Sequence, residues 1–198
     1  MINLDEKITT YLNKNLYEYP TTLCLFMKRD NNPQVINYNN TTLYNYLFDR
    51  YRFHCLNILS FYIGTRNIYV NSLLRFFVNS RIFNIITDKT SDQISYNKKI
   101  FENEAYNKKI FENEAYKNME FDIIFNHSLQ SLESNMLFLE DALKKLKSGG
   151  ICIIENIQYD DIENYKKLYK SYDIKNIHIV SIPYEINKFN NILISQKS

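Results

Sequence analysis

The chain has 198 residues, with 24 basic and 22 acidic side chains and a net charge of +2. This length suits a single domain, and the near-neutral balance argues against a nucleic-acid-binding protein, which usually has a basic excess. No apolar stretch approaches the ~20 residues of a membrane span, and the early acids Asp5 and Glu6 argue against a secretory signal. We therefore expect an intracellular, cytoplasmic protein with no membrane partner.

The composition is skewed toward residues with AT-rich codons. Asn occurs 27 times and Ile 26 times, whereas Gly and Pro occur three times each. The few glycines are informative against this bias; they are Gly64, Gly149 and Gly150. The cysteines are too far apart in sequence to suggest a zinc site, and we expect reduced, buried thiols at all three of them. They are Cys24, Cys55 and Cys152.

Predicted helices and strands alternate along most of the chain. Residues 1–30 have helical spacing, and Thr42 could cap a helix that extends to Tyr51. Ser148-Gly149-Gly150 is predicted to end a helix that begins near Ser131. The predicted strands are residues 56–63, 82–86, 121–125, 151–154, 176–182 and 191–195. Further helices are predicted at residues 71–78, 131–146 and 161–172. The alternation predicts an α/β fold with a mostly parallel sheet covered on both faces.

One internal repeat interrupts this pattern. The ten residues YNKKIFENEA at 96–105 recur without change at 106–115. Two ten-residue units are too few and too short for a solenoid. We expect residues 96–115 to form a mostly helical surface insertion; a helix that binds a partner is the alternative.

The second half of the chain resembles a known family. Phe121-Asp122 opens a predicted strand, a predicted helix follows, and Lys147-Ser148-Gly149-Gly150 leads to a strand that ends in Glu155-Asn156. This course resembles class I S-adenosylmethionine-dependent methyltransferases. It is most similar to the branch of macrocin-type and rhamnosyl-type sugar O-methyltransferases and cephalosporin hydroxylase-like proteins. The resemblance implies a Rossmann-like methyltransferase domain over residues 41–198, with an antiparallel last strand, after an N-terminal helical segment at 1–40.

The resemblance also implies where S-adenosylmethionine would bind. Gly64 and Thr65 follow the first strand, Asp88 lies near the end of the second, and Asn126 follows the third. In the family an acidic residue at the end of the second strand accepts hydrogen bonds from the cofactor ribose. Ile86 stands at that position, so we expect cofactor binding to be weak or lost.

The candidate catalytic residues are Asn126 and His127. They begin the stretch Asn-His-Ser-Leu-Gln, where the family has Asp-Asp-Gly-Ser-His and holds a divalent ion. Asn126 is a weaker ligand for a hard cation than a carboxylate, so we predict no metal there. His127 could act as a general base. The alternative is a turn histidine that faces solvent, since the sequence shows no partner to orient it.

Two functions from different classes stay open. The first is a methyltransferase that acts on a sugar or another small hydroxyl compound. The second is a catalytically inactive methyltransferase-like module that binds a protein partner, because sites rather than folds decide activity. An RNA-binding methyltransferase-like subunit is a weaker third alternative, because the chain lacks the basic excess that such binding needs.

Overall fold

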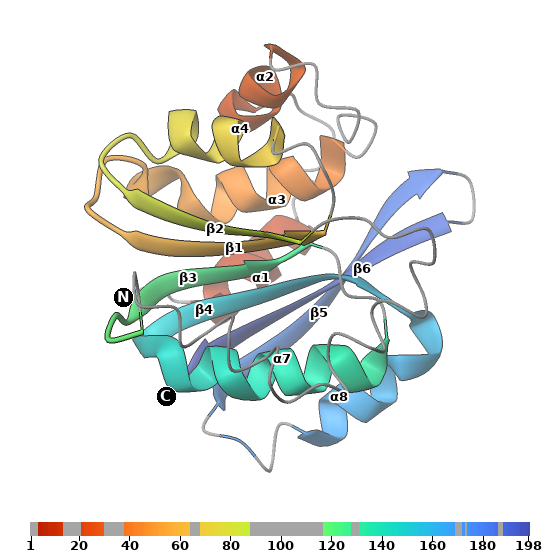
Figure 1. The fold of residues 1–198 in the computed structure, drawn as a ribbon. Coiled ribbons are helices and arrows are strands. Elements are labelled where there is room, and N and C mark those ends of the chain that lie inside the picture. The colour runs from red at the N-terminus through yellow and green to blue at the C-terminus, as the bar shows by residue number, and fades with distance from the viewer. Residues whose placement is uncertain are drawn as a thin grey trace.

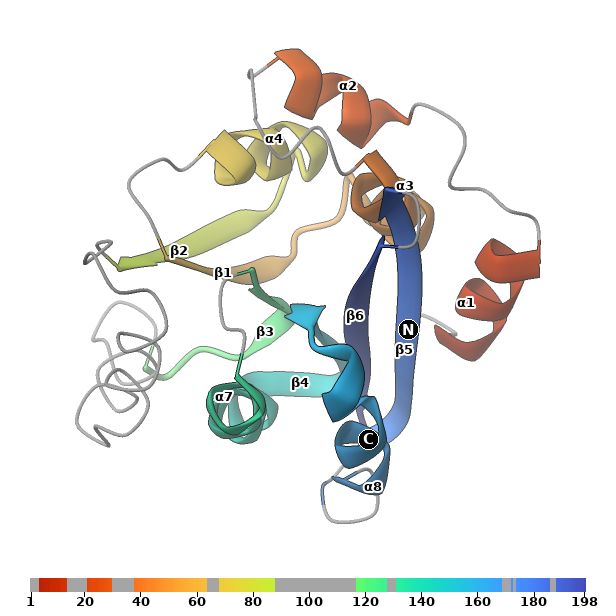
Figure 2. The ribbon, with the colours of Figure 1, turned by 90° about the vertical axis from the view of Figure 1, so that its right-hand side faces the viewer.

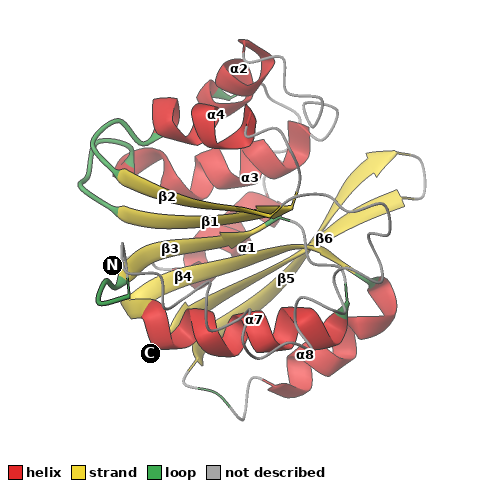
Figure 3. Cartoon of the chain, in the orientation of Figure 1, coloured by secondary structure: helices red, strands yellow, loops and turns green. Residues whose placement is uncertain are grey.

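A six-stranded sheet forms the centre of the molecule, and helices cover both of its faces (Figure 1). The computed structural model describes residues 4–13, 21–29, 38–63, 68–87, 117–127, 131–168, 172, 174–185 and 188–198. The strands lie in the order β2-β1-β3-β4-β6-β5. Helices and strands alternate along the chain, as Figure 3 shows, and the predicted α/β class is therefore confirmed.

Most of the strand pairs are parallel. The strands are β1 Asn57–Ile63, β2 Arg81–Thr87, β3 Phe121–Asn126, β4 Leu146–Ile157, β5 Ile174–Glu185 and β6 Lys188–Lys197. β1 pairs in parallel with β2 and β3, and β3 pairs in parallel with β4. β6 runs antiparallel to its neighbours β4 and β5, which confirms the prediction for the last strand. The parallel pairs place the carboxyl ends of β1, β3 and β4 at one edge, where open α/β sheets bind ligands.

Four helices lie on one side of the sheet, away from α7 and α8 in Figure 2, and α2 reaches the sheet through α3 and α4, on which it packs. They are α1 Leu4–Asn13, α2 Thr22–Arg29, α3 Tyr38–Phe48 and α4 Ile68–Phe76. Their apolar side chains share one core with inward side chains of the strands, such as Ile58, Phe125 and Ile153. Leu4 and Leu23 belong to this core. The N-terminal helices are therefore packed into the same interior as the sheet.

Two helices cover the other face, namely α7 Leu132–Lys145 and α8 Ile162–Leu168. The side chain of Ser131 caps α7, because its hydroxyl oxygen accepts the N–H of Ser134 at 3.2 Å. Lys144 and Lys145 lie in the last turn, where positive charge favours the helix dipole. Phe138 and its neighbours form a second core with this face of the sheet. The buried run Ile151 to Ile154 of β4 is apolar throughout, as expected of a strand that is covered on both faces.

Two predicted helix boundaries are wrong, and a third predicted helix is too long. Thr42 does not cap α3, which begins at Tyr38 and is followed by the 3-10 helix η3, Asp49–Tyr51. Ser148 to Gly150 do not end α7, because the helix stops at Lys145 and β4 begins at the next residue. The helix predicted at 161–172 is shorter, since the 3-10 helix η4, at 159–161, leads into α8.

The glycine pair serves the strand instead of the helix. Gly149 has a φ of 74°, a backbone angle that residues other than glycine rarely adopt. A Cβ atom on Gly150 would lie 2.9 Å from the carbonyl oxygen of Lys147 and 3.1 Å from that of Phe121. The pair therefore lets β4 start directly after α7 while packing closely against β3.

The cysteine prediction holds only in part. Cys152 is buried, and burial raises the pKa of its thiol well above the ordinary range. Cys55 is exposed, so the prediction of a buried thiol is wrong there: it lies in the loop between η3 and β1. The side chain of Cys24 and the repeat at 96–115 lie outside the described residues. Among the helices that the structure describes, none is long and apolar enough to span a bilayer.

Candidate functional site

The carboxyl ends of β1 and β3 lie side by side. Phe61 pairs with Asn126 in the parallel register, and the N–H of His127 donates to the carbonyl of Phe61 at 3.1 Å. The residue that follows β3 is therefore held against the end of β1. This is the edge of the sheet at which the resemblance places the cofactor and the reaction.

The cofactor contacts predicted for Gly64, Thr65 and Asp88 fall outside the described residues and stay predictions. Ile86 lies in β2, where its backbone pairs with that of Tyr62 in β1. Its side chain is also outside the described residues. For the predicted cofactor contacts, the structure therefore describes the paired backbones of β1 and β2 but not the side chains.

His127 is buried, so the expectation of a turn histidine facing solvent is wrong. The residue is 4% exposed, and its ring stacks on Phe125 with centroids 5.3 Å apart and planes 14° apart. Its Nδ1 atom lies 3.1 Å from Oε2 of Glu155, which follows the apolar run of β4. The imidazole therefore faces a buried carboxylate at close range. Glu155 is thus the orienting partner that the sequence did not reveal.

Helix α3 completes the surroundings of Glu155. The hydroxyl of Tyr44 donates to Oε1 of Glu155 at 2.5 Å, and the Asn40 side chain also hydrogen-bonds the carboxylate. Burial raises the pKa of Glu155, but the charge and close contact of His127 and the hydrogen bonds from α3 lower it by more. The net pKa lies below the ordinary value of 4.5, so Glu155 is ionised at neutral pH.

Asn126 faces the opposite side of the sheet from His127. Its side-chain Nδ2 donates to Oδ1 of Asn135 in α7 at 3.0 Å, and both side chains are fully buried. Tyr165 of α8 is buried on the same face, and burial raises the pKa of its hydroxyl. Asn126 therefore joins β3 to α7 in the structure, while a catalytic or cofactor-binding role for it stays a prediction.

Asn156 adopts a backbone conformation that is uncommon outside glycine. Its φ is 61°, and the β4–β6 register shifts between Ile154 and Ile157. The Asn156 side chain donates to the carbonyl of His127 at 3.3 Å. This bulge turns the end of β4 and ties it to the end of β3, beside the His127–Glu155 pair.

The described residues do not fit a divalent metal ion. Hard cations take several oxygen ligands, usually including carboxylates. The Asn126 amide is directed to Asn135, and the carboxylate nearest His127 is already hydrogen-bonded by Tyr44. Within the described ranges no group of three His, Cys, Asp or Glu side chains could hold one ion. The absence of a metal at Asn126 and His127 stays a prediction.

No family model and no curated protein matches the sequence. The fold is similar to that of the MycE methyltransferase from the mycinamycin biosynthetic pathway. In the MycE complex with magnesium, S-adenosylhomocysteine and mycinamycin VI, the TM-score is 0.57 at 15% identity over 90% of this chain. A second MycE crystal form, with magnesium and S-adenosylhomocysteine, gives 0.56 at 15% identity over 99% of this chain.

The alignments cover 55% and 61% of the MycE chain, so this chain spans little more than half its length. At such low identity the likeness shows the fold alone. That fold is a Rossmann-like methyltransferase fold, in agreement with the resemblance found in the sequence.

Proposed function

We propose that the chain is an S-adenosylmethionine-dependent methyltransferase that acts on a hydroxyl of a sugar or another small molecule. The observation that carries this proposal is the His127–Glu155 pair. It combines an imidazole with an ionised carboxylate at the carboxyl edge of a methyltransferase fold. A base that is oriented by a second group is the arrangement that general base catalysis requires.

Each of these side chains has a distinct role in the proposal. His127 faces Glu155 with Nδ1, so Nε2 is the atom that accepts the proton of the acceptor hydroxyl. The carboxylate of Glu155 stabilises the imidazolium that forms. Tyr44 occupies the other carboxylate oxygen and holds Glu155 in place.

Bound at this edge, S-adenosylmethionine would supply the methyl group to the acceptor oxygen, with S-adenosylhomocysteine as the second product. Gly64 and Thr65 are proposed to lie against it, because backbone can approach a ligand closely at a glycine that follows a strand. Asp88 is proposed to accept hydrogen bonds from its ribose, in place of an acid at Ile86. The weak cofactor binding expected from the sequence follows from this displaced carboxylate.

A specific observation favours a second function, an inactive binding module. Asn126 is fully buried, and both ring nitrogens of His127 are shielded from solvent. A base must reach the proton that it removes, so an acceptor could meet Nε2 of His127 only after neighbouring groups move. A module that binds a protein partner needs no such access.

Calorimetric titration with S-adenosylmethionine and S-adenosylhomocysteine separates the two functions. Saturable binding of either compound supports the methyltransferase, and transfer of a labelled methyl group to one of a panel of free sugars would establish it. His127→Gln should then retain binding but lose about 100-fold or more of the transfer rate. Failure of both compounds to bind would contradict the first proposal and leave the binding module.

A further inference from the structure

A cavity lies at the amino edge of the sheet, on the far side from His127. It has a volume of about 330 Å³ and is formed by the segment between α3 and β1, the start of β3 and the start of β4. Its lining includes Tyr51, His54, Asp122, Lys147 and Gly149. Small-molecule sites of proteins have volumes of this order and combine apolar walls with a few polar groups.

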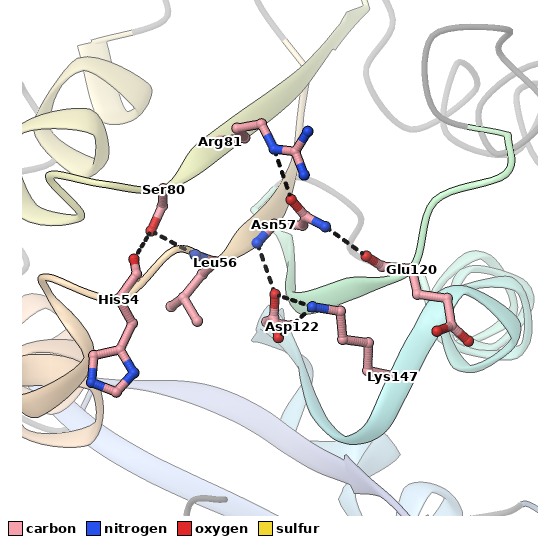
Figure 4. Close-up of polar contacts among 8 residues, drawn as sticks. All are labelled: His54, Leu56, Asn57, Ser80, Arg81, Glu120, Asp122 and Lys147. Carbon is pink, nitrogen blue, oxygen red and sulfur yellow. Dashed lines mark hydrogen bonds and ion pairs between the residues drawn. The ribbon is translucent and has the colours of Figure 1, made fainter.

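An ion pair supplies the charged groups of this cavity. Lys147 Nζ lies 2.9 Å from Oδ1 and 2.8 Å from Oδ2 of Asp122. The N–H of Asn57 donates to Oδ2 at 2.8 Å, and Arg81 Nε donates in turn to the Asn57 side chain at 3.1 Å, as Figure 4 shows. The network fixes the Asp122 carboxylate at the start of β3. The ion pair is neutral overall, so a neutral ligand would bind here at a lower desolvation cost than an ion.

The pair keeps one donor and one acceptor for a ligand. An ammonium group has three N–H donors, and within the described residues two of those of Lys147 are directed to Asp122. Among the residues that the structure describes, Oδ2 of Asp122 accepts from both Asn57 and Lys147, whereas Oδ1 accepts from Lys147 alone. Oδ1 therefore retains a lone pair, and it lies 2.9 Å from the ammonium nitrogen that carries the remaining N–H.

The other lining groups favour a flat molecule. The rings of Tyr51 and His54 contact each other edge to face, with centroids 5.3 Å apart. Gly149 and Gly150 present peptide backbone without side chains. Aromatic rings stack on flat partners, and a glycine backbone allows a ring to approach closely.

We propose that this cavity binds a neutral, flat ring that carries an N–H next to a carbonyl, as in a pyrimidinone. The ring N–H donates to Oδ1 of Asp122, and the ring carbonyl accepts from Nζ of Lys147. Tyr51 and His54 contact the face or edge of the ring. This site is separate from the proposed methyltransferase site and does not depend on it.

Uracil is the probe that tests the proposal, in an NMR titration of the full-length, isotope-labelled chain. Saturable shifts of the backbone amides at 51–56 and 147–151 are expected. Replacement of both ring N–H groups in 1,3-dimethyluracil should weaken binding about tenfold or more, because the hydrogen bond to Asp122 is lost. Shifts that do not saturate up to the solubility limit of uracil, or equal binding of the two compounds, would overturn the proposal.

Two variants keep the test independent of folding. The side chain of His54 is exposed, so His54→Ala should weaken uracil binding without loss of stability. Tyr159→Ala, at an exposed position after the carboxyl end of β4, serves as the matched control and should leave binding unchanged. If both variants bind uracil as the unchanged chain does, the aromatic contact assigned to His54 is wrong.

Discussion

The surroundings of single side chains at the candidate active site arise from contacts between distant parts of the chain. Tyr44 and Glu155 are separated by 111 positions, yet their side chains are joined by a hydrogen bond of 2.5 Å. His127 meets Glu155 because β3 and β4 are neighbours in the sheet. No local spacing encodes such contacts, so the sequence could suggest His127 as a base but not its partner.

Replacement of Glu155 should destabilise the fold strongly. Glu155→Gln removes the carboxylate that accepts from Tyr44 and faces His127, and loss of a buried hydrogen bond to a charged group costs about 1.5–3 kcal/mol. Urea unfolding at neutral pH measures this loss. Glu120→Gln, at an exposed position, should change the free energy of unfolding by no more than about 0.5 kcal/mol. Equal effects of the two substitutions would contradict the buried pair.

The pH dependence of stability should reflect the same carboxylate. The pKa of Glu155 in the folded chain lies below its ordinary value of 4.5, so the native state favours the ionised form. This contribution is complete above pH 4.5 and is lost as the pH falls through the folded-state pKa. The free energies of unfolding of the unchanged chain and of Glu155→Gln should therefore converge as the pH falls below 4.5 and through the folded-state pKa. A constant difference over that range would disprove the lowered pKa.

A substitution in β2 tests the cofactor site. Ile86→Asp places a carboxylate at the position where the resembled family has its ribose-binding acid. A charge-assisted hydrogen bond is worth about 1.5–3 kcal/mol, so affinity for S-adenosylmethionine should rise about tenfold or more. Calorimetry measures the change, with Ile86→Asn as the uncharged control. If neither variant binds, the pocket differs from that of the family at more positions than this one.

At the scale of elements, apolar runs located the strands, but the element ends depended on packing. The run Ile151-Cys152-Ile153-Ile154 predicted β4, yet the strand extends five residues further toward its start, from Leu146. Leu146 pairs with Phe121 of β3, the register then shifts before Ile151, and Gln196 of β6 donates to the carbonyl of Gly149 at 3.0 Å. Tertiary contacts of this kind override the local signal of two adjacent glycines for the end of a helix.

The start of β4 should tolerate no side chain at Gly150. In Gly150→Ala the new Cβ would meet two backbone carbonyl oxygens at 2.9 and 3.1 Å, and such crowding costs about 1–3 kcal/mol. The free energy of unfolding, from urea titration, measures the cost. Ser148→Ala, at the exposed position two residues earlier, should stay within about 0.5 kcal/mol of the unchanged chain. A Gly150→Ala chain as stable as that control would show that the backbone can shift there.

At the scale of the whole molecule, the N-terminal helices share the interior of the sheet. Leu23 of α2 is fully buried, whereas Leu25 of the same helix is 59% exposed. Leu23→Ala should cost about 2–5 kcal/mol, because it leaves a cavity in the shared core. Leu25→Ala is the matched control and should cost less than about 1 kcal/mol. Thermal unfolding compares them, and similar melting temperatures would contradict the shared core.

The overall architecture was predictable because it follows from repeated, local patterns. Alternating helices and strands imply a covered parallel sheet, and the resemblance over 121–157 specified the methyltransferase form of that sheet. The candidate site was less predictable. Asn126 and His127 are adjacent in sequence, but they lie on opposite faces of the sheet because successive strand residues alternate. Only the placement of the helices decides which of these two residues is directed toward α3 and which is directed toward α7.

The position of β6 has a consequence for how the chain folds. β6 follows β5 along the chain but lies between β4 and β5 in the sheet. β5 and β6 can first form a local hairpin, since their pairing is antiparallel and their loop is short. Until that hairpin docks, β4 presents an open edge along Ile151 to Ile154. We therefore expect a nascent or partly folded chain to be prone to aggregation through this strand until the docked hairpin covers it.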